Sequence, residues 1–234
     1  ESESKISGLA TALSALQTFQ ASAQTLDDLS DFNSFSVGNS QTTAFTATAS
    51  TSASSGSHTV EVTSVARAQR SNMVADGPAD FTSTTQTLNS GTAFDLTVAI
   101  GPDGNQTSHT VSVTTATPAG IVSALNAADL GITARLTDVG TSGTSYKIQL
   151  TGESGTDKAF SITPSVNSML TTATPSGQTA ANADITVDGL QFSRATNSIN
   201  DIIPGVTLDL NAATSGAANM SINQDTSAAK TKIT

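Results

Sequence analysis

The chain has 234 residues, with 19 acidic residues against nine Lys or Arg, a net charge of −10 and no cysteine or tryptophan. So few basic residues cannot supply the stripe that neutralises nucleic-acid phosphates, and the lack of cysteine excludes disulfides and thiolate zinc sites. No window approaches the roughly 18 apolar residues that span a bilayer, and residue 1 does not open a signal peptide, so a soluble chain without membrane insertion is expected.

Residues 1–30 carry the pattern of one amphipathic helix. Its apolar residues recur at alternating gaps of three and four, and Leu26 and Leu29 continue the pattern. The stripe is narrow, as in a coiled coil, and predicts a helix packing interface made of Ile6, Leu9, Leu13 and Leu16. An ordinary surface helix docked on its own domain is the alternative. Because no second long helical pattern follows, the partner helix is expected in sequence outside these 234 residues.

The following segment, residues 31–56, predicts a connection rich in Ser, Thr and Asn with isolated phenylalanines. From there the apolar period changes to two. Val60 and Val62 alternate with polar neighbours, which predicts a half-buried strand.

A hairpin and a short helix are predicted next. Residues 94–100 and 109–113 alternate on either side of a Gly-Pro-Asp-Gly turn. Thr117 is then expected to cap a helix that begins at Pro118 and is terminated by Gly131.

A second hairpin, 132–136 with 146–150, and a last strand at 160–162 complete this unit, and residues 164–182 are expected to be a polar stretch without strands. This order predicts one antiparallel sheet with a helix laid on it.

Another β unit begins at Asp184. Strands are expected at 185–187, 190–192, 206–210 and 220–222, with turns at Asp188-Gly189 and Pro204-Gly205 and a short helical or extended link near Ile199. The expected fold class is α+β and mostly β, with two antiparallel β-rich domains, one of them with a short helix, on a helical stem.

Few residues are candidates for metal binding or acid–base catalysis. His58 and His109 are the only imidazoles, and without cysteine or a helical partner they are expected to be solvent-facing rather than metal ligands. The acidic cluster at 27–31 lacks the pattern of a calcium loop and is read as a solvated helix end. Glu153 and Asp157 could pair as acid and base, but solvated turn carboxylates are the favoured interpretation. No enzyme activity, metal or cofactor is therefore expected.

Three stretches resemble bacterial flagellar filament capping proteins, the hook-associated protein 2 family. Residues 4–26 are similar to the family's stem helix, and 121–151 to a helix and hairpin unit of flagellar axial proteins. The third stretch is the most specific: ITVDGL at 185–190, SRATNSI at 193–199 and IPGVTLDL at 203–210. Its family-motif residues, expected to be structural, are Asp188, Gly189, Asn197 and Gly205.

The resemblance implies a secreted structural protein at the distal tip of the flagellum, outside the cell. It implies a small homo-oligomeric ring that promotes flagellin folding and polymerisation, with flagellin and hook–filament junction proteins as partners and host mucin as a further candidate. Because the β surfaces lack an obvious Trp, Tyr or Arg hot spot, subunit contacts are expected to be individually weak and the chain monomeric in dilute solution.

The resemblance also implies one β domain inserted in another. Residues 1–36 would form part of the stem, 37–75 with 178–226 the inner domain, 76–177 the outer domain, and 227–234 the start of the return to the stem. Val60 would then pair near Ile185 or Val206. The rival interpretation is a bacterial surface adhesin module that binds host glycan or mucin, and a glycan-active enzyme is a distant third.

Overall fold

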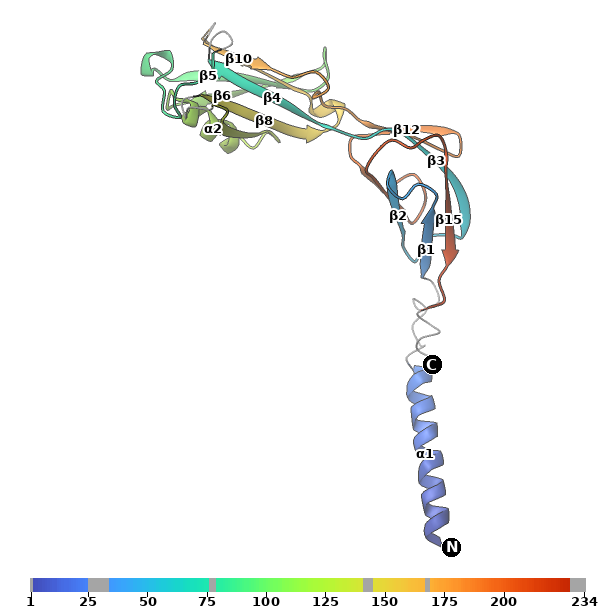
Figure 1. Cartoon of the computed structure of the whole chain (residues 1–234). Coiled ribbons are helices and arrows are strands. Elements are labelled where there is room, and N and C mark those ends of the chain that lie inside the picture. Colours follow the sequence, from blue (N-terminus) through green and yellow to red (C-terminus); the bar gives the residue numbers. More distant parts are fainter. Residues whose placement is uncertain (1, 25–33, 76–78, 141–144, 167–168, 228–234) are drawn as a thin grey trace. The chain divides into compact units, whose positions relative to one another are not determined.

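The computed structural model describes residues 2–24, 34–75, 79–140, 145–166 and 169–227 (Figure 1). It is mostly β, and its strands form antiparallel sheets, which confirms the predicted fold class. The chain divides into two compact units. Unit 1 comprises Glu1–Glu61, Thr186–Leu190 and Ser198–Thr234, and unit 2 comprises Val62–Ile185 and Gln191–Asn197. The domain boundaries predicted from the sequence differ from the edges of these units and stay a prediction.

The long N-terminal helix α1 spans Ser2–Gln24. The hydroxyls of Thr11 and Thr18 donate hydrogen bonds to the backbone carbonyls of Ser7 and Ser14, one turn earlier. Both hydroxyl groups therefore have hydrogen-bond partners within the helix. The predicted continuation at Leu26 and Leu29 and the acidic cluster at 27–31 lie outside the described residues, as does 228–234.

Two sheets are built from β1 (Phe35–Asn39), β2 (Phe45–Ala49), β3 (Gly56–Ser64), β11 (Ala183–Val187), β12 (Leu190–Arg194), β13 (Ser198–Ile199), β14 (Val206–Leu210) and β15 (Ala218–Gln224). Most of their residues belong to unit 1, but β3 and β11 cross its edge and β12 belongs to unit 2 from Gln191 onward. One sheet has the order β1-β15-β3-β11-β12 and another the order β13-β14-β2. β3 lies beside β11, so the predicted pairing of Val60 near Ile185 is confirmed. The alternative near Val206 is wrong, because β14 pairs with β2.

Two of these strands correct the sequence analysis. The segment 31–56 was expected to be a connection, but it contains β1, which pairs with β15, and β2, which pairs with β14. Phe45 begins β2 and is fully buried. The link expected near Ile199 is extended: it starts with the two-residue strand β13. β1 and β2 were missed because the strands that pair with them lie about 160 or more residues away in sequence.

Unit 2 is built from β4 (Ala68–Ala75), β5 (Phe94–Ile100), β6 (Thr107–Val113), α2 (Pro118–Ala127), β7 (Thr133–Asp138), β8 (Tyr146–Ser154), β9 (Phe160–Pro164) and β10 (Leu170–Ala173), with short 3-10 turns η2 (Asn89–Gly91) and η3 (Thr156–Lys158). Both predicted hairpins form. The expected single sheet is wrong: there are two, β10-β4-β8-β7 and β6-β5-β9. The polar stretch 164–182 supplies β10, and β4 was also missed.

The core of unit 2 joins both sheets and the helix. Met73, Leu96, Ile121 and Ile148 come from β4, β5, α2 and β8 and are fully buried in one apolar cluster. The Thr117 hydroxyl accepts a hydrogen bond from the Gly120 backbone N–H, which confirms the predicted cap of α2. The predicted terminator is wrong, because the helix already ends at Ala127, four residues before Gly131.

Candidate functional site

Among the residues that the structure describes, α1 carries five of the seven large apolar side chains that stay exposed. Ile6, Leu9, Leu13 and Leu16 are 58–74% exposed, and so is Phe19, which the sequence analysis did not include. Its signal was the spacing of three from Leu16, which places it next to the stripe. Covering such side chains is worth about 1.5–3 kcal/mol each, so this face is a surface on which a partner helix gains stability.

A second candidate feature is the turn between β11 and β12. Asp188 and Gly189 have φ of 50° and 82°, the left-handed pair that a two-residue type I′ hairpin requires. Gly189 meets this requirement without strain, and Asp tolerates it better than most residues. The Asp-Gly pair predicted from the sequence therefore sets the geometry of this hairpin.

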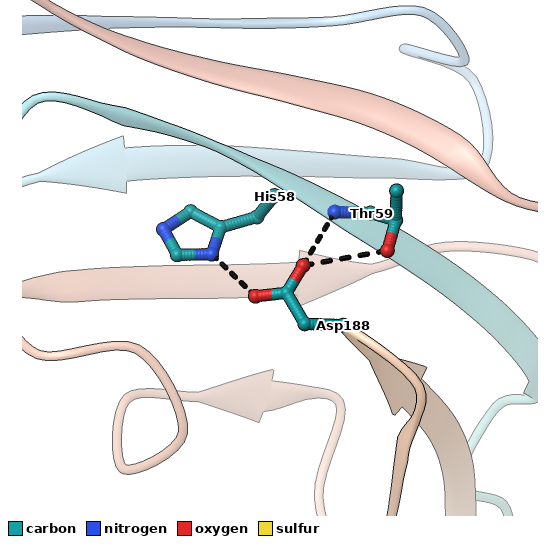
Figure 2. A network of polar contacts seen from close by, with 3 residues as sticks. All are labelled: His58, Thr59 and Asp188. Carbon is teal, nitrogen blue, oxygen red and sulfur yellow. Dashed lines mark hydrogen bonds and ion pairs between the residues drawn. The ribbon is translucent and has the colours of Figure 1, made fainter.

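The Asp188 carboxylate also ties the turn to β3 (Figure 2). It accepts hydrogen bonds from His58 Nδ1 at 2.7 Å, from the Thr59 backbone N–H at 2.8 Å and from the Thr59 hydroxyl at 3.3 Å. The hydrogen bond from His58, followed by that from the Thr59 backbone, lowers the pKa of Asp188 below its ordinary value of 3.8.

The sequence predicted a solvent-facing His58, but its imidazole is engaged by Asp188. Its side chain is 26% exposed and is held by Asp188, 130 residues further along the chain. No local pattern links the two residues, which is why the sequence analysis missed the contact. Within the described ranges, no three His, Asp or Glu side chains come together as metal ligands.

The other two family-motif residues have structural contacts of their own. The Asn197 side chain donates to the carbonyl of Ala66 at 2.9 Å and accepts from the Ala66 backbone N–H at 2.7 Å. The side-chain amide thus makes the two hydrogen bonds that the backbone of a neighbouring strand would make. Gly205 has φ of 73°, and a Cβ there would lie 2.5 Å from the backbone nitrogen of Ala53. Only glycine fits that approach.

The predicted site residues therefore do not form one site. Asp188 and Gly189 share a hairpin in unit 1, Gly205 lies in another turn of unit 1, and Asn197 belongs to unit 2. Each fixes a turn or a strand end. The four helix residues lie together on α1.

The candidate acid and base are not arranged for catalysis. Glu153 Oε2 lies 2.8 Å from Lys158 Nζ, and both side chains are more than half exposed. The hydrogen bond and charge of Glu153 raise the pKa of Lys158, so this exposed carboxylate is engaged by an ammonium group. Asp157 lies in η3 beside this pair.

A search for membrane-crossing helices gave none among the residues that the structure describes, since neither α1 nor α2 is both long and apolar enough.

Comparison with solved structures defines the class. The D1-D2-D3 domains of the Escherichia coli flagellar cap protein FliD match with a TM-score of 0.66 and 29% identity, covering 97% of this chain and 67% of that chain. The E. coli D2-D3 fragment matches with a TM-score of 0.63 and 26% identity, covering 82% of this chain and all of that one. The chain thus has the fold of a flagellar cap protein.

Sequence comparison gives the family. Models of the N-terminus and the C-terminus of flagellar hook-associated protein 2 match residues 1–69 and 180–234. Flagellar hook-associated protein 2 of Treponema maltophilum is 43% identical over 53 residues, which are 23% of this chain and 8% of that protein. The chain belongs to the flagellar hook-associated protein 2 family, as its resemblance predicts. Its location is accordingly the flagellum, at the cap of the filament and outside the cell.

Proposed function

We propose that the protein containing this chain caps the growing flagellar filament as a ring of identical subunits and promotes the folding and polymerisation of flagellin. The observation that carries the proposal is the match of almost the whole chain to the E. coli cap protein. The role is structural rather than enzymatic, and the exposed Glu153–Lys158 pair supports this assignment. Flagellin and the hook–filament junction proteins are the proposed partners.

The helix α1 supplies the attachment to the rest of the cap. Its narrow apolar face is exposed, as in a coiled-coil helix that packs along another helix. About a third of the matched E. coli three-domain chain has no counterpart in these 234 residues, and we propose that the partner helix lies in that part. The residues proposed for the interface are Ile6, Leu9, Leu13 and Leu16, with Phe19 beside them.

The proposed domain organisation is a stem at 1–36, an inner domain of 37–75 and 178–226, an outer domain of 76–177, and the start of the return to the stem at 227–234. It is supported by the shares of this chain covered by the two E. coli structures. The three-domain structure covers 97% and the D2-D3 fragment 82%, and the difference corresponds to about 35 residues, close to the length of the proposed stem.

The adhesin alternative is not favoured, because the two E. coli structures that match 97% and 82% of this chain are flagellar cap proteins. Binding of host mucin remains a prediction.

The test is complementation. The full-length protein is expressed in a bacterium of its own species that lacks the cap gene and therefore releases flagellin unassembled. Restored filaments are expected, seen by electron microscopy, together with a fall in free flagellin in the medium. Normal secretion of the protein without any filament would contradict the proposal.

A further inference from the structure

The strand β6 of unit 2 is a long sheet edge without the usual protection against pairing. It lies at one edge of the sheet β6-β5-β9 and, with seven residues, is the longest edge strand that the structure describes. Edge strands are commonly kept from pairing with other chains by charged side chains, by proline, by a bulge or by being short. The β6 sequence, TSHTVSV, has no Lys, Arg, Asp, Glu or Pro, and its pairing with β5 has no irregularity. The edge is therefore open to the addition of a further strand.

The backbone groups that β6 directs away from its sheet follow from the strand register. In an antiparallel sheet, successive residues of a strand direct their N–H and C=O groups toward opposite neighbours. The carbonyl of Asp95 in β5 accepts a hydrogen bond from the N–H of Ser165, so the odd-numbered residues of β5 face β9. Its even-numbered residues face β6, where their partners are odd-numbered. Ser108, Thr110 and Ser112 are therefore left with outward N–H and C=O groups, for which the described residues provide no backbone partner.

The side chains of β6 distinguish its two faces. Val111 and Val113 are buried in the core of unit 2, whereas Ser108, Thr110 and Ser112 are exposed. An added antiparallel strand has the same alternation, because residues directly opposite each other have side chains on the same face. Its residues that bond to the outward groups of β6 would therefore expose their side chains. The residues between them would turn their side chains toward the core side of the sheet.

A hollow of about 450 Å³ lies between β6 and α2, within the usual size range of ligand-binding pockets. The helix α2 lies on the core side of β6, since Ile121 belongs to the same apolar cluster as Val111. At Gly120 a Cβ would collide with the carbonyl oxygen of Thr115, so glycine is needed where this loop meets the helix. The α2 residues that line the hollow all have small side chains, namely Gly120, Ser123, Ala124, Ala127 and Ala128. Space thus remains beside the edge for the side chains of an added strand.

We propose that β6 and α2 form a docking groove for an extended segment of another protein chain, which pairs antiparallel to β6 as a fourth strand of the sheet. The outward main-chain groups of Ser108, Thr110 and Ser112 bind this segment. Medium-sized apolar side chains at its alternate positions, such as valine, enter the hollow. This docking function goes beyond the proposed capping role and does not depend on it.

The charge and the size of the groove define the partner. Every residue that lines the hollow is uncharged, so the contacting stretch of the partner is uncharged as well. Seven residues at about 3.4 Å each, across a width on the order of 10 Å, give an area of about 240 Å². This area is well below the ~800 Å² per partner of a stable interface between folded proteins. The edge therefore fits a single extended segment rather than a folded second copy of this chain.

An NMR titration of the ¹⁵N-labelled protein tests the proposal. The probe is a peptide of alternating threonine and valine with capped ends and flanking lysines for solubility. Hydrogen bonds to the three N–H and three C=O groups predict a dissociation constant on the order of 100 μM. The amide signals of Ser108, Thr110 and Ser112 should shift and their hydrogen exchange should slow, more than for the odd-numbered residues already bonded to β5. Unchanged signals at millimolar peptide would overturn the proposal, and so would shifts that depend on protein concentration without peptide, which would place a second copy on the edge.

N-methylated versions of the same peptide test the geometry of the added strand. In the proposed antiparallel arrangement the threonine N–H groups face β6, whereas the valine N–H groups face away from it. Methylation of the threonine amides should weaken binding at least about tenfold, and methylation of the valine amides should change it less than about threefold. The two peptides have the same charge. Equal weakening by both, or weakening by valine methylation alone, would contradict the proposed pairing.

Variants of the protein test the two walls of the groove. Thr110→Pro removes an outward N–H at a position where an edge strand tolerates proline, and Ala127→Leu fills the hollow from α2. Each should weaken peptide binding about tenfold. Ala119→Leu makes the same change at an exposed α2 position outside the hollow and should leave binding nearly unchanged. Amide spectra of the free variants check folding, and Ala127→Leu supplies the test if Thr110→Pro does not fold. Unchanged binding in Ala127→Leu, or an equal loss in Ala119→Leu, would overturn the proposal.

Discussion

The helix α1 and the strand units differ in how far their large apolar side chains are exposed to solvent. In the strand units Phe45, Leu96 and Ile148 are fully buried, whereas on α1 Phe19 and the leucines are more than half exposed. A strand unit therefore contains within this chain what it needs to fold. The helix presents its apolar residues for a partner, so the same residue type has a folding role in one region and an assembly role in the other.

The sharpest way to break this comparison is to remove the same side chain from both regions. Phe45→Ala empties a fully buried position and should lower the free energy of unfolding of unit 1 by about 3–5 kcal/mol. Phe19→Ala removes a ring that is 72% exposed and should change it by less than about 0.5 kcal/mol. Urea unfolding followed by circular dichroism measures both. Equal losses would show that α1 is packed on the strand unit.

A second prediction concerns backbone fit inside unit 1. Alanine at Gly205 or Gly216, both with φ near 70°, should cost about 1–2 kcal/mol for the left-handed backbone. Gly205→Ala also presses its Cβ against the backbone of Ala53, which should add about 1–3 kcal/mol, whereas nothing lies within 4 Å of the corresponding point at Gly216. Thermal unfolding of the two variants gives the difference. Identical melting temperatures would argue against the close approach.

Asn197 provides a third test, in unit 2. Asn197→Ala removes both hydrogen bonds to the backbone of Ala66 and should lower stability by about 1–3 kcal/mol. The control is Asn200→Ala, because Asn200 is exposed and its expected effect is below about 0.5 kcal/mol. Hydrogen exchange at the Ala66 amide should accelerate in the first variant alone. An unchanged exchange rate would mean that the amide does not hold this strand end.

The smallest expected effect is the pH dependence from Asp188. Its pKa is lowered in the folded state, so the stability from its ionised form is present above 3.8 and is lost as the pH falls through the folded-state pKa. The side chain is about half exposed, so solvent screening keeps this contribution small. An NMR titration of the Asp188 carboxyl group should give a midpoint below 3.8. In Asp188→Asn the stability difference from wild type should shrink below that pH, and a midpoint at or above 3.8 would refute the hydrogen-bonded turn.

Much of the fold could be predicted where large apolar residues alternate with polar ones, as in β5 and β8. A helix start could be predicted where the sequence has a typical N-cap residue followed by proline, as at Thr117-Pro118. The missed strands lack that signal. β4 buries Gln69 and Ser71 on its inner face, so alternation of polarity does not mark it. The Gln69 amide is satisfied by the backbone of Phe160, 91 residues away, which no local pattern reveals.

The candidate site divides in the same way. The exposed stripe of α1 and the Asp-Gly turn follow from spacing and residue type, so both were accessible from the sequence. The contact of His58 with Asp188 and the hydrogen bonds between Asn197 and Ala66 join residues that are far apart in sequence, and only the fold brings them together.

Filament assembly by helix-face variants of the full-length protein tests the central claim most directly. Leu9→Ser/Leu13→Ser alters the exposed stripe, and Thr11→Ser/Ala15→Ser, on the opposite side of the helix at about 3.6 residues per turn, is the control. We predict that both variants keep the unfolding transition of the strand units, that the control restores filaments in the cap-deficient bacterium, and that the stripe variant does not. Filaments of normal number and length with Leu9→Ser/Leu13→Ser would contradict the account.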